Sequence, residues 1–184
     1  MQVEDLGLSG LKLIRPRVFE DQRGFFLESY NFERYARAGI ECVFVQDNHS
    51  RSVQGTLRGL HYQSSPGQAK LLRVASGRIF DVAVDIRPDS PTFGKWQGVT
   101  LDAQNHHQLF IPVGFAHGFC VLSETADVLY KVSSVYVAAT ECGIRYDDPE
   151  IAVTWPVSNP IVSDRDKTAE GFADYRRRMR GARA

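Results

Sequence analysis

Short apolar segments that alternate with polar positions recur along most of the chain, and Gly- and Pro-rich stretches separate them. Such runs are typical of β-strands, and "ASG", "RPDSP" and "IPVGF" supply turn geometry between them. The predicted strands are 11–19, 24–30, 41–48, 55–63, 69–75, 77–86, 96–102, 107–112, 117–122 and 127–137. Their close spacing favours an antiparallel sandwich or barrel over alternating βα units.

Two segments have helical character. "NFERYARAG" carries an N-capping Asn31 and a C-terminal Gly39, which predicts a short surface helix. "RDKTAEGFADYRRRMR" (165–180) is charged and periodic, so we expect residues 167–184 to form a helical or partly disordered tail. With no internal repeat or linker, the pattern predicts one all-β domain spanning 1–184, with short peripheral helices.

Composition narrows the class of protein. The chain has 184 residues, enough for one well-buried domain, and 22 basic residues balance 22 acidic ones. A nucleic-acid or membrane surface would show as a basic excess, so neither partner is expected. Three cysteines cannot all pair and lack metal-ligand spacing, and the N-terminus has no leader pattern. These features predict a reduced, cytoplasmic protein.

The segment "GTLRGLHYQ" (55–63) places an arginine and a histidine in a predicted strand. Strict alternation puts Leu57 and Gly59 on the face of His61, and Arg58 on the opposite face with its neighbours Leu60 and Tyr62. Charged groups are rarely threaded through a core strand. The segment therefore suggests that His61 points into a polar pocket.

Two of the five histidines stand in recognisable spacings. His61 closes a Gly-x5-His segment and His117 closes Pro-x-Gly-x-x-His, and these resemble the two motifs of the cupin superfamily, a β jelly roll. Metal-binding cupins continue the first motif as His-x-His with a nearby glutamate. Here Gln63 takes the second position and no glutamate follows before Glu124, so we expect no metal site. An imidazole without a metal is free to act as a base.

A longer set of segments extends this resemblance. The segments are "RGFFLESY", "FVQDNHSRS", "GTLRGLHYQ", "QAKLLRV", "GRIFDVAVDIRPDSPTFGKW", "QLFIPVGFAHGF" and "ECGIRYDDPEIAVTWP". Together they resemble the dTDP-4-dehydrorhamnose 3,5-epimerases, in the same order and over about residues 13–166. The resemblance implies a cupin-like antiparallel β jelly roll that needs no cofactor. Its implied substrate is a dTDP-6-deoxy-4-ketohexose, epimerised at carbons 3 and 5 through an enolate.

The resemblance also implies a role for individual residues. His61 matches the family's base, and Asp166 matches the carboxylate that orients it. Lys70 matches the cation beside the developing oxyanion, and Tyr130 matches the acid that reprotonates the opposite face. An ordinary phenol pKa near 10 makes tyrosine a competent proton donor at neutral pH.

Substrate contacts and assembly are implied in the same way. The matching substrate-binding residues are Arg23, Glu28, Gln46, Asp47, Asn48, Arg58, His117, Tyr136, Glu141 and Arg165. Arginine suits a diphosphate because its planar fork donates twice to paired oxygens, and Phe26 could stack on the thymine or line the sugar pocket. The family works as a homodimer with strand exchange, so part of the N-terminal segment can reach the partner's pocket.

Three alternatives stay open from the sequence. One is a single-centre epimerase that inverts carbon 3 or carbon 5 of a related dTDP-4-keto-6-deoxysugar in secondary metabolism. Another is a non-catalytic sugar-binding jelly roll, although binding alone does not require the proton donor Tyr130. The last is a metal-dependent cupin oxygenase or isomerase.

Overall fold

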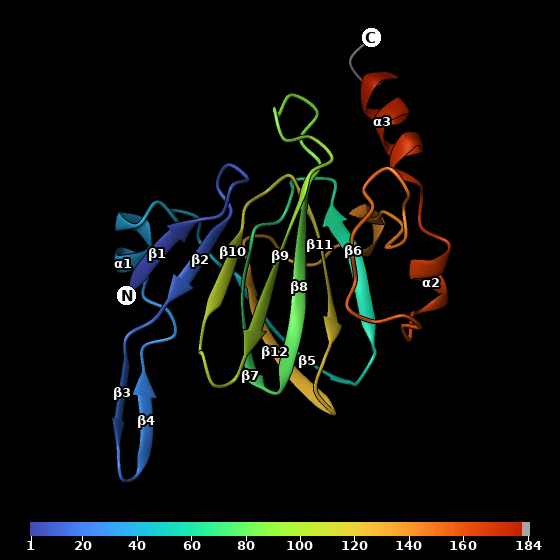
Figure 1. Ribbon diagram of the computed structural model, residues 1–184. Coiled ribbons are helices and arrows are strands. Elements are labelled where there is room, and N and C mark those ends of the chain that lie inside the picture. The colour runs from blue at the N-terminus through green and yellow to red at the C-terminus, as the bar shows by residue number, and fades with distance from the viewer. Residues whose placement is uncertain (182–184) are drawn as a thin grey trace.

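Two antiparallel sheets face each other and make up most of the computed structural model, which describes residues 1–181 (Figure 1). The six-stranded sheet has the order β1 (Gln2–Asp5), β2 (Lys12–Arg15), β10 (Gln108–Ile111), β7 (Lys70–Ser76), β12 (Thr125–Val132), β5 (Gln46–Val53). The five-stranded sheet has the order β13 (Glu141–Gly143), β6 (Leu57–Gln63), β11 (Phe115–Val121), β8 (Arg78–Asp85), β9 (Trp96–Asp102). This is the all-β jelly roll that the sequence predicts. The predicted single domain and its tail extend to residue 184, and 182–184 lie outside the described residues.

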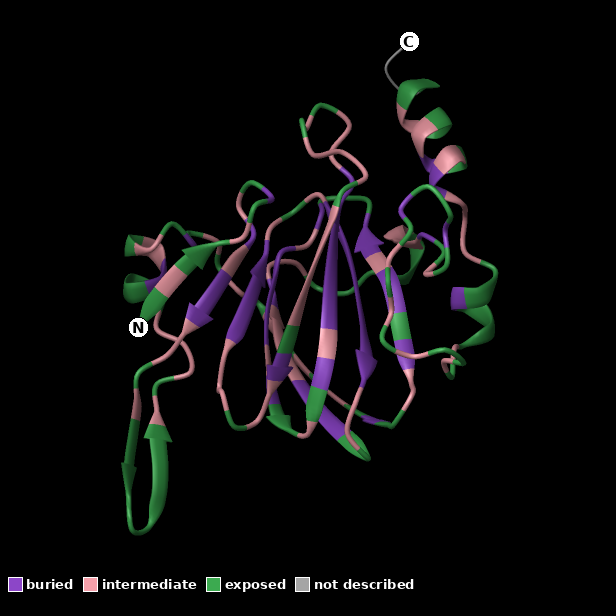
Figure 2. Ribbon diagram, viewed as in Figure 1, coloured by how far each residue is buried: buried purple, intermediate pink, exposed green. Residues whose placement is uncertain are grey.

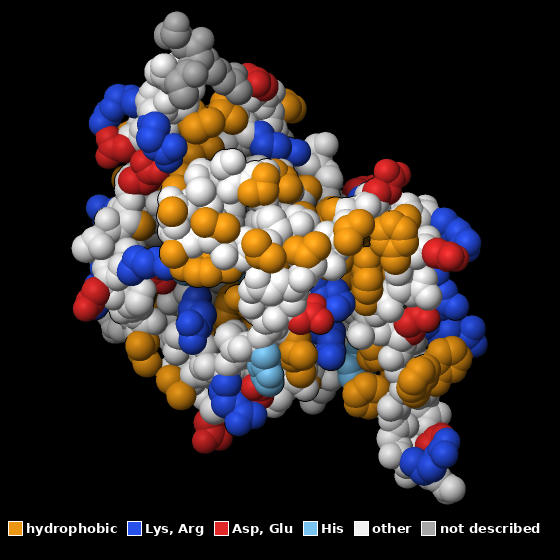
Figure 3. Space-filling model, turned by 180° about the vertical axis from the view of Figure 1, so that it is seen from behind, with side chains coloured by type: hydrophobic (Ala, Val, Ile, Leu, Met, Phe, Trp, Pro, Cys, Tyr) orange, Lys and Arg blue, Asp and Glu red, His pale blue; other side chains and the backbone are white. Residues whose placement is uncertain are grey.

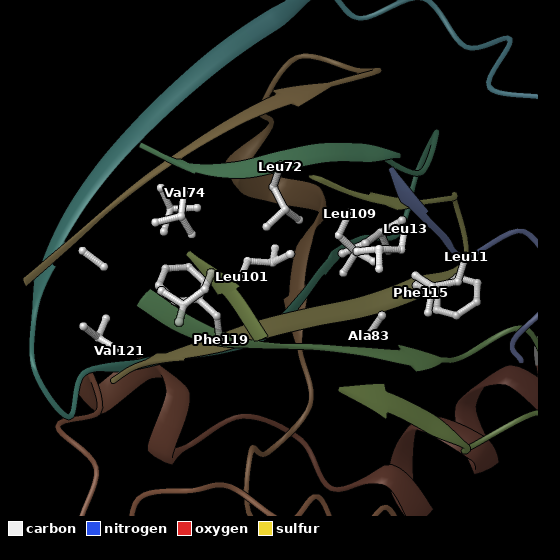
Figure 4. Close-up of a cluster of buried hydrophobic side chains, with 14 of the residues drawn as sticks. Leu11, Leu13, Leu72, Val74, Ala83, Leu101, Leu109, Phe115, Phe119 and Val121 are labelled. Atoms are coloured by element: carbon white, nitrogen blue, oxygen red, sulfur yellow. The ribbon is translucent and has the colours of Figure 1, made fainter. Parts of the chain in front are cut away.

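The main core lies between the two sheets. Leu72 and Leu109 from the six-stranded sheet meet Leu101, Phe119 and other apolar side chains of the five-stranded sheet (Figure 4). Burial is densest along the central strands, where β10 and β11 are buried at every position rather than at every second one (Figure 2). Removal of this apolar surface from water holds the sheets together.

A two-stranded hairpin projects away from both sheets. It consists of β3 (Val18–Asp21) and β4 (Gly24–Leu27) and extends beyond the rest of the molecule (Figure 1). The single strand predicted for 11–19 is therefore wrong, because β2 ends at Arg15 and β3 begins only at Val18. Pro16 lies at this break, where its missing N–H and fixed φ favour the end of a ladder.

Strand β6 contains a bulge that changes which side chains share a face. His117 of β11 pairs with His61, but Phe119 pairs with Arg58, so two steps on β11 match three steps on β6. One extra residue in β6 reverses the alternation within the strand. The expectation that Arg58 faces away from His61 is wrong, since both side chains line the same cavity.

Gly59 makes this bulge possible. Its φ of +124° lies where side chains are strongly disfavoured. A Cβ at Gly59 would also lie 2.5 Å from the Cα of Gly118 and 2.7 Å from the carbonyl oxygen of His117. The close approach of β6 and β11 therefore requires glycine at this position.

The helices lie at the periphery. Helix α1 (Phe32–Arg37) begins as predicted, with the Asn31 side chain accepting a hydrogen bond from the backbone of Arg34 at 3.2 Å. The segment 165–180 is not one helix but two, α2 (Asp164–Lys167) and α3 (Phe172–Gly181), and a 3-10 turn, η1 (Ala138–Thr140), precedes β13. None of the helices in the described part of the chain could cross a membrane.

Candidate active site

A cavity of about 820 Å³ opens between the two sheets, which is within the range of sites that hold small organic ligands. One wall comes from β5, β7 and β12 of the six-stranded sheet, and the other from β6, β11 and β13, with α2 and the segment before it at the rim. The predicted site residues that line it are Gln46, Asn48, Arg58, His61, Lys70, His117, Tyr130, Tyr136, Glu141, Arg165 and Asp166.

His61 and Asp166 form a hydrogen-bonded pair on one side of this cavity. His61 Nε2 lies 2.6 Å from Oδ1 of Asp166, whose other oxygen accepts from the backbone N–H of Gly59 at 3.3 Å. Helix α2 holds Asp166 in place, because Ser163 caps this helix and accepts from the Asp166 N–H. The carboxylate fixes the tautomer with a proton on Nε2, which leaves Nδ1 as the basic nitrogen.

The charge of Asp166 is stabilised in place. Burial raises the pKa of this carboxyl, but the hydrogen bond and the charge of His61, with the Gly59 and Ser163 contacts, outweigh burial and bring the pKa below its ordinary value. Asp166 therefore stays ionised at neutral pH. A permanent carboxylate stabilises the imidazolium that forms when His61 accepts a proton.

Tyr130 lies on the other wall of the cavity. It belongs to β12 of the six-stranded sheet, whereas His61 belongs to β6 of the five-stranded sheet. Burial raises the pKa of the Tyr130 phenol, although the positive charge of Arg58 opposes that rise. The phenol is therefore protonated at neutral pH and able to donate.

Lys70 is a buried cation on β7, in the same sheet as Tyr130. Its ammonium donates to the carbonyl oxygen of His61 at 3.4 Å. Burial lowers the pKa of Lys70 to about 8, although Asp81 and Glu141 favour its charged form. Lys70 is therefore mostly charged at neutral pH, in a place where little water can screen it.

His117 is paired with a second buried carboxylate. Its Nε2 lies 2.9 Å and 3.1 Å from the two oxygens of Asp81 on β8. Burial lowers the pKa of His117, even though the Asp81 charge opposes the change. The imidazole of His117 is therefore neutral at neutral pH.

The rim of the cavity carries a polar cluster. Glu141 Oε2 accepts from the Tyr136 hydroxyl and from the Arg165 guanidinium, both at 2.7 Å. Across the opening, Gln46 accepts from the Tyr136 backbone N–H at 3.0 Å and donates to Asn48 at 2.8 Å. These contacts hold an aromatic ring and a guanidinium at the entrance, a combination that suits a base and a phosphate.

Three predicted substrate ligands lie outside the cavity of this chain. Arg23 sits in the β3–β4 hairpin and is paired with Asp21. Glu28 pairs with Arg34 at 3.1 Å. Asp47 pairs with Lys131 on the outer face of β5, because alternation turns Asp47 away from Gln46 and Asn48. Phe26, in the same hairpin as Arg23, is 70% exposed.

Sequence reasoning missed other residues that line the cavity, including Gln63 and Gln68. Gln63 could have been found, because alternation places it on the face of His61. Asp81 was also missed, and its signal was a single carboxylate within the apolar strand "RIFDVAV". Within residues 1–181, no group of three or more His, Cys, Asp or Glu side chains is arranged to hold a metal ion.

Comparison with known proteins identifies close relatives of this chain. A family model described as dTDP-4-dehydrorhamnose 3,5-epimerase matches residues 5–174. The dTDP-4-dehydrorhamnose 3,5-epimerase of Shigella flexneri is 51% identical over 176 residues, which cover 95% of this chain and 97% of that protein. The dTDP-4-dehydrorhamnose 3-epimerase of Streptomyces niveus is 40% identical over 178 residues, which cover 96% and 86%.

A solved structure gives the same result for the fold. The dTDP-6-deoxy-D-glucose-3,5-epimerase of Legionella pneumophila, in complex with dTDP-4-keto-L-rhamnose, superposes with a TM-score of 0.91. It is 48% identical, and the match covers 94% of this chain and 93% of that one.

Proposed function

The chain belongs to the dTDP-4-dehydrorhamnose 3,5-epimerase family, and on this basis we propose how its cavity inverts a dTDP-6-deoxy-4-ketohexose. The protein is an epimerase that acts at carbons 3 and 5 of the sugar. The ketone at carbon 4 acidifies the protons on both neighbours, so removal of either proton gives an enolate. Inversion then requires a base on one face, an acid on the other and a group that stabilises the oxyanion.

His61 is the proton acceptor. Because Asp166 holds the proton on Nε2, Nδ1 is free to take a proton from carbon 3 or carbon 5. The charge that develops on the imidazole lies beside a buried, ionised carboxylate. This arrangement of base and orienting acid is the geometry that general base catalysis needs.

Tyr130 is the proton donor. Its phenol comes from the facing sheet, so a sugar ring held between the walls has the base on one side and the acid on the other. Donation to the enolate carbon from the side of Tyr130 inverts the centre. Before the next cycle the phenolate regains a proton and the His61 imidazolium releases the one that it accepted.

Lys70 stabilises the enolate oxygen. A buried ammonium costs no reorganisation when the carbonyl oxygen becomes negative, and the low dielectric strengthens the attraction. Its carbonyl partner is on His61, so the cation and the base share one end of the cavity.

The nucleotide lies toward the rim. Arg58 and Arg165 bind the diphosphate, and Tyr136 stacks on or beside the thymine, while His117 contacts the sugar. Gln46, Asn48 and Glu141 shape the entrance by the hydrogen bonds that hold Tyr136. The proposed reaction uses only these side chains and requires no cofactor.

The protein acts as a homodimer in the cytoplasm. Arg23, Glu28 and Phe26 lie outside the cavity of their own chain, and the hairpin that carries Arg23 and Phe26 projects from the molecule. Apolar side chains also gather on the face seen from behind (Figure 3). In the dimer, the N-terminal segment reaches the partner's pocket and adds these residues to the nucleotide site. Asp47 joins them only if Lys131 releases it.

The pairing of His61 with Asp166, opposite Tyr130, is the observation that carries this proposal. The test is proton-exchange NMR on a dTDP-6-deoxy-4-ketohexose in heavy water, with this protein alone. Deuterium should enter at carbons 3 and 5, with inversion at both. Exchange at neither carbon would reject the proposal.

A single-centre epimerase is the second candidate. It is favoured by the likeness to the 3-epimerase of Streptomyces niveus, but that likeness is weaker than the 51% identity to a 3,5-epimerase. The same experiment separates the two, because a single-centre enzyme introduces deuterium at one carbon.

A further inference from the structure

Asp81 is a fully buried carboxylate that the mechanism above does not use. It is 0% exposed and lies in the middle of β8, between apolar neighbours. Its hydrogen-bond partner in the described residues is His117, at 2.9 Å and 3.1 Å. Burial of a charge without compensation is costly, so a carboxylate at this depth must be offset by groups of the site itself.

The contact fixes the tautomer of His117. A carboxylate accepts only, so the neutral imidazole must donate from Nε2, and Nδ1 is left as an acceptor. His117 lines the cavity. It therefore presents an acceptor that suits a sugar hydroxyl, rather than a donor for a phosphate oxygen.

Asp81 also affects the protonation of Lys70. The cationic form of Lys70 is favoured by two carboxylates, Asp81 and Glu141. Glu141 already accepts from Arg165 and Tyr136 at the rim, so much of its charge is balanced there. Among residues 1–181 no arginine pairs with Asp81, and its side chain is closed off from water. Of the two carboxylates, Asp81 raises the pKa of Lys70 more than Glu141 does.

Other charged or titratable groups line the same cavity as Lys70. They are Arg58, His61 and Tyr62 on β6, His117 on β11, Tyr130 on β12, Tyr136 before η1, Glu141 on β13, and Arg165 and Asp166 on α2. Asp166 is engaged by His61, so it does not replace Asp81.

We propose that Asp81 is a positioning residue of the reaction: its carboxylate holds His117 with Nδ1 as the acceptor and is the counter-ion of Lys70. The catalytic part of this inference rests on the role of Lys70 in the proposed function. The electrostatic part does not, and it can be measured without turnover.

The decisive variant is Asp81→Asn, which keeps the shape and a carbonyl acceptor for His117 but removes the charge. Titration of Lys70, followed by the NMR shift of its Nζ or Cε, should move to lower pH by on the order of one unit or more. The fall of kcat at alkaline pH, which we call the alkaline limb of its pH profile, should move to lower pH together with the Lys70 titration. An unmoved Lys70 titration would overturn the proposal. If the titration moves and the alkaline limb does not, the counter-ion is supported and the role of Lys70 in the proposed function is rejected.

Two controls separate this role from ordinary loss of structure. Asp85→Asn removes an equally buried carboxylate on the same strand, whose partners Arg87, Ser90 and Thr92 lie outside the cavity. It should lower Tm without moving the alkaline limb. In a Lys70→Gln background, Asp81→Asn should lose most of its effect on kcat, whereas additive effects would contradict action through Lys70.

The wild-type protein provides a further test that does not depend on the variant folding. Nitrogen-15 NMR of His117 should show a neutral ring with its proton on Nε2. A proton on Nδ1, or a charged ring at pH 7.5, would overturn the assignment.

Discussion

His61 and Tyr130 line the same cavity from different sheets, His61 from β6 and Tyr130 from β12. A flat sugar ring bound between the walls presents one face to the imidazole and the other to the phenol. Removal of a proton toward one sheet and its return from the other therefore changes configuration. If both groups belonged to one wall, the same chemistry would return the proton to its original side.

Replacement of His61 by alanine should remove proton exchange at carbons 3 and 5 together. The variant has no base, and general base catalysis commonly contributes roughly 10²–10⁴-fold. Binding of dTDP, measured by calorimetry, should survive because the rim residues are unchanged. Normal exchange in His61→Ala would show that another group is the base.

Replacement of Asp166 by asparagine should lower kcat by roughly 10²–10⁴-fold. The imidazole loses the anion that stabilises its charged form, and the asparagine amide does not enforce the Nε2 proton. Asp164→Asn is the matched control, because its exposed carboxylate on the same short helix pairs only weakly with Lys167 at 3.1 Å. Equal losses in the two variants would point to damage to α2 rather than to the base.

Tyr130→Phe should slow completed inversion more than initial proton loss. His61 still generates the enolate, so exchange with heavy water continues while the epimerised product accumulates slowly. NMR that follows both exchange and product measures the two rates. Tyr175→Phe removes a buried hydroxyl that donates to the Ile86 carbonyl at 2.6 Å, away from the cavity, so it should alter stability alone. Normal product formation by Tyr130→Phe would refute the two-wall arrangement.

Gly59→Ala should destabilise the protein by on the order of 3 kcal/mol, from the positive φ together with the clash against Gly118. Gly55→Ala is the control, since Gly55 has a φ of +77° but no atom of the described residues lies within 4 Å of an added Cβ, and it should cost about 1 kcal/mol. Urea denaturation gives both values. If the two costs were the same, the close approach of β6 to β11 would not be what demands glycine.

The pH profile of kcat should fall on its alkaline side near pH 8. Burial lowers the pKa of Lys70 to about 8, so the ammonium is present below this pH and is lost as the pH rises through it. Lys70→Arg keeps its charge at all these values, so a slower enzyme without this limb is expected. Persistence of the limb in Lys70→Arg would assign it to another group.

The apolar pattern predicts most of the strands, but it misplaces the bounds of a strand whose inner face is a polar wall of the cavity. Strand β5 is an example, because it begins at Gln46 and continues through residues with polar side chains. Gln46, Asn48 and Ser50 face the cavity, while Asp47 and every second residue after it face outward. The hydrophobicity argument placed a strand at 41–48, which reaches only the first three residues of β5, since it cannot distinguish a polar pocket wall from a loop.

The candidate site could likewise be predicted only in part. The resemblance to a family identified His61, Lys70, Tyr130 and Asp166 as candidate catalytic residues, and the structure gathers these four around one cavity. Strict alternation gave the wrong face for Arg58, because a bulge depends on a close contact with β11 that lies far away in sequence. Arg23 lies outside the cavity, in the turn of the β3–β4 hairpin, where it pairs with Asp21.

The extra residue in β6 has one more consequence. Loss of the bulge with every residue retained would restore a regular pleat. Because three steps separate Arg58 from His61, one of those two side chains would then be aimed out of the cavity. The straightened strand would still contain every chemical group that the reaction needs, but the enzyme would be inert because one of those groups would face away from the substrate.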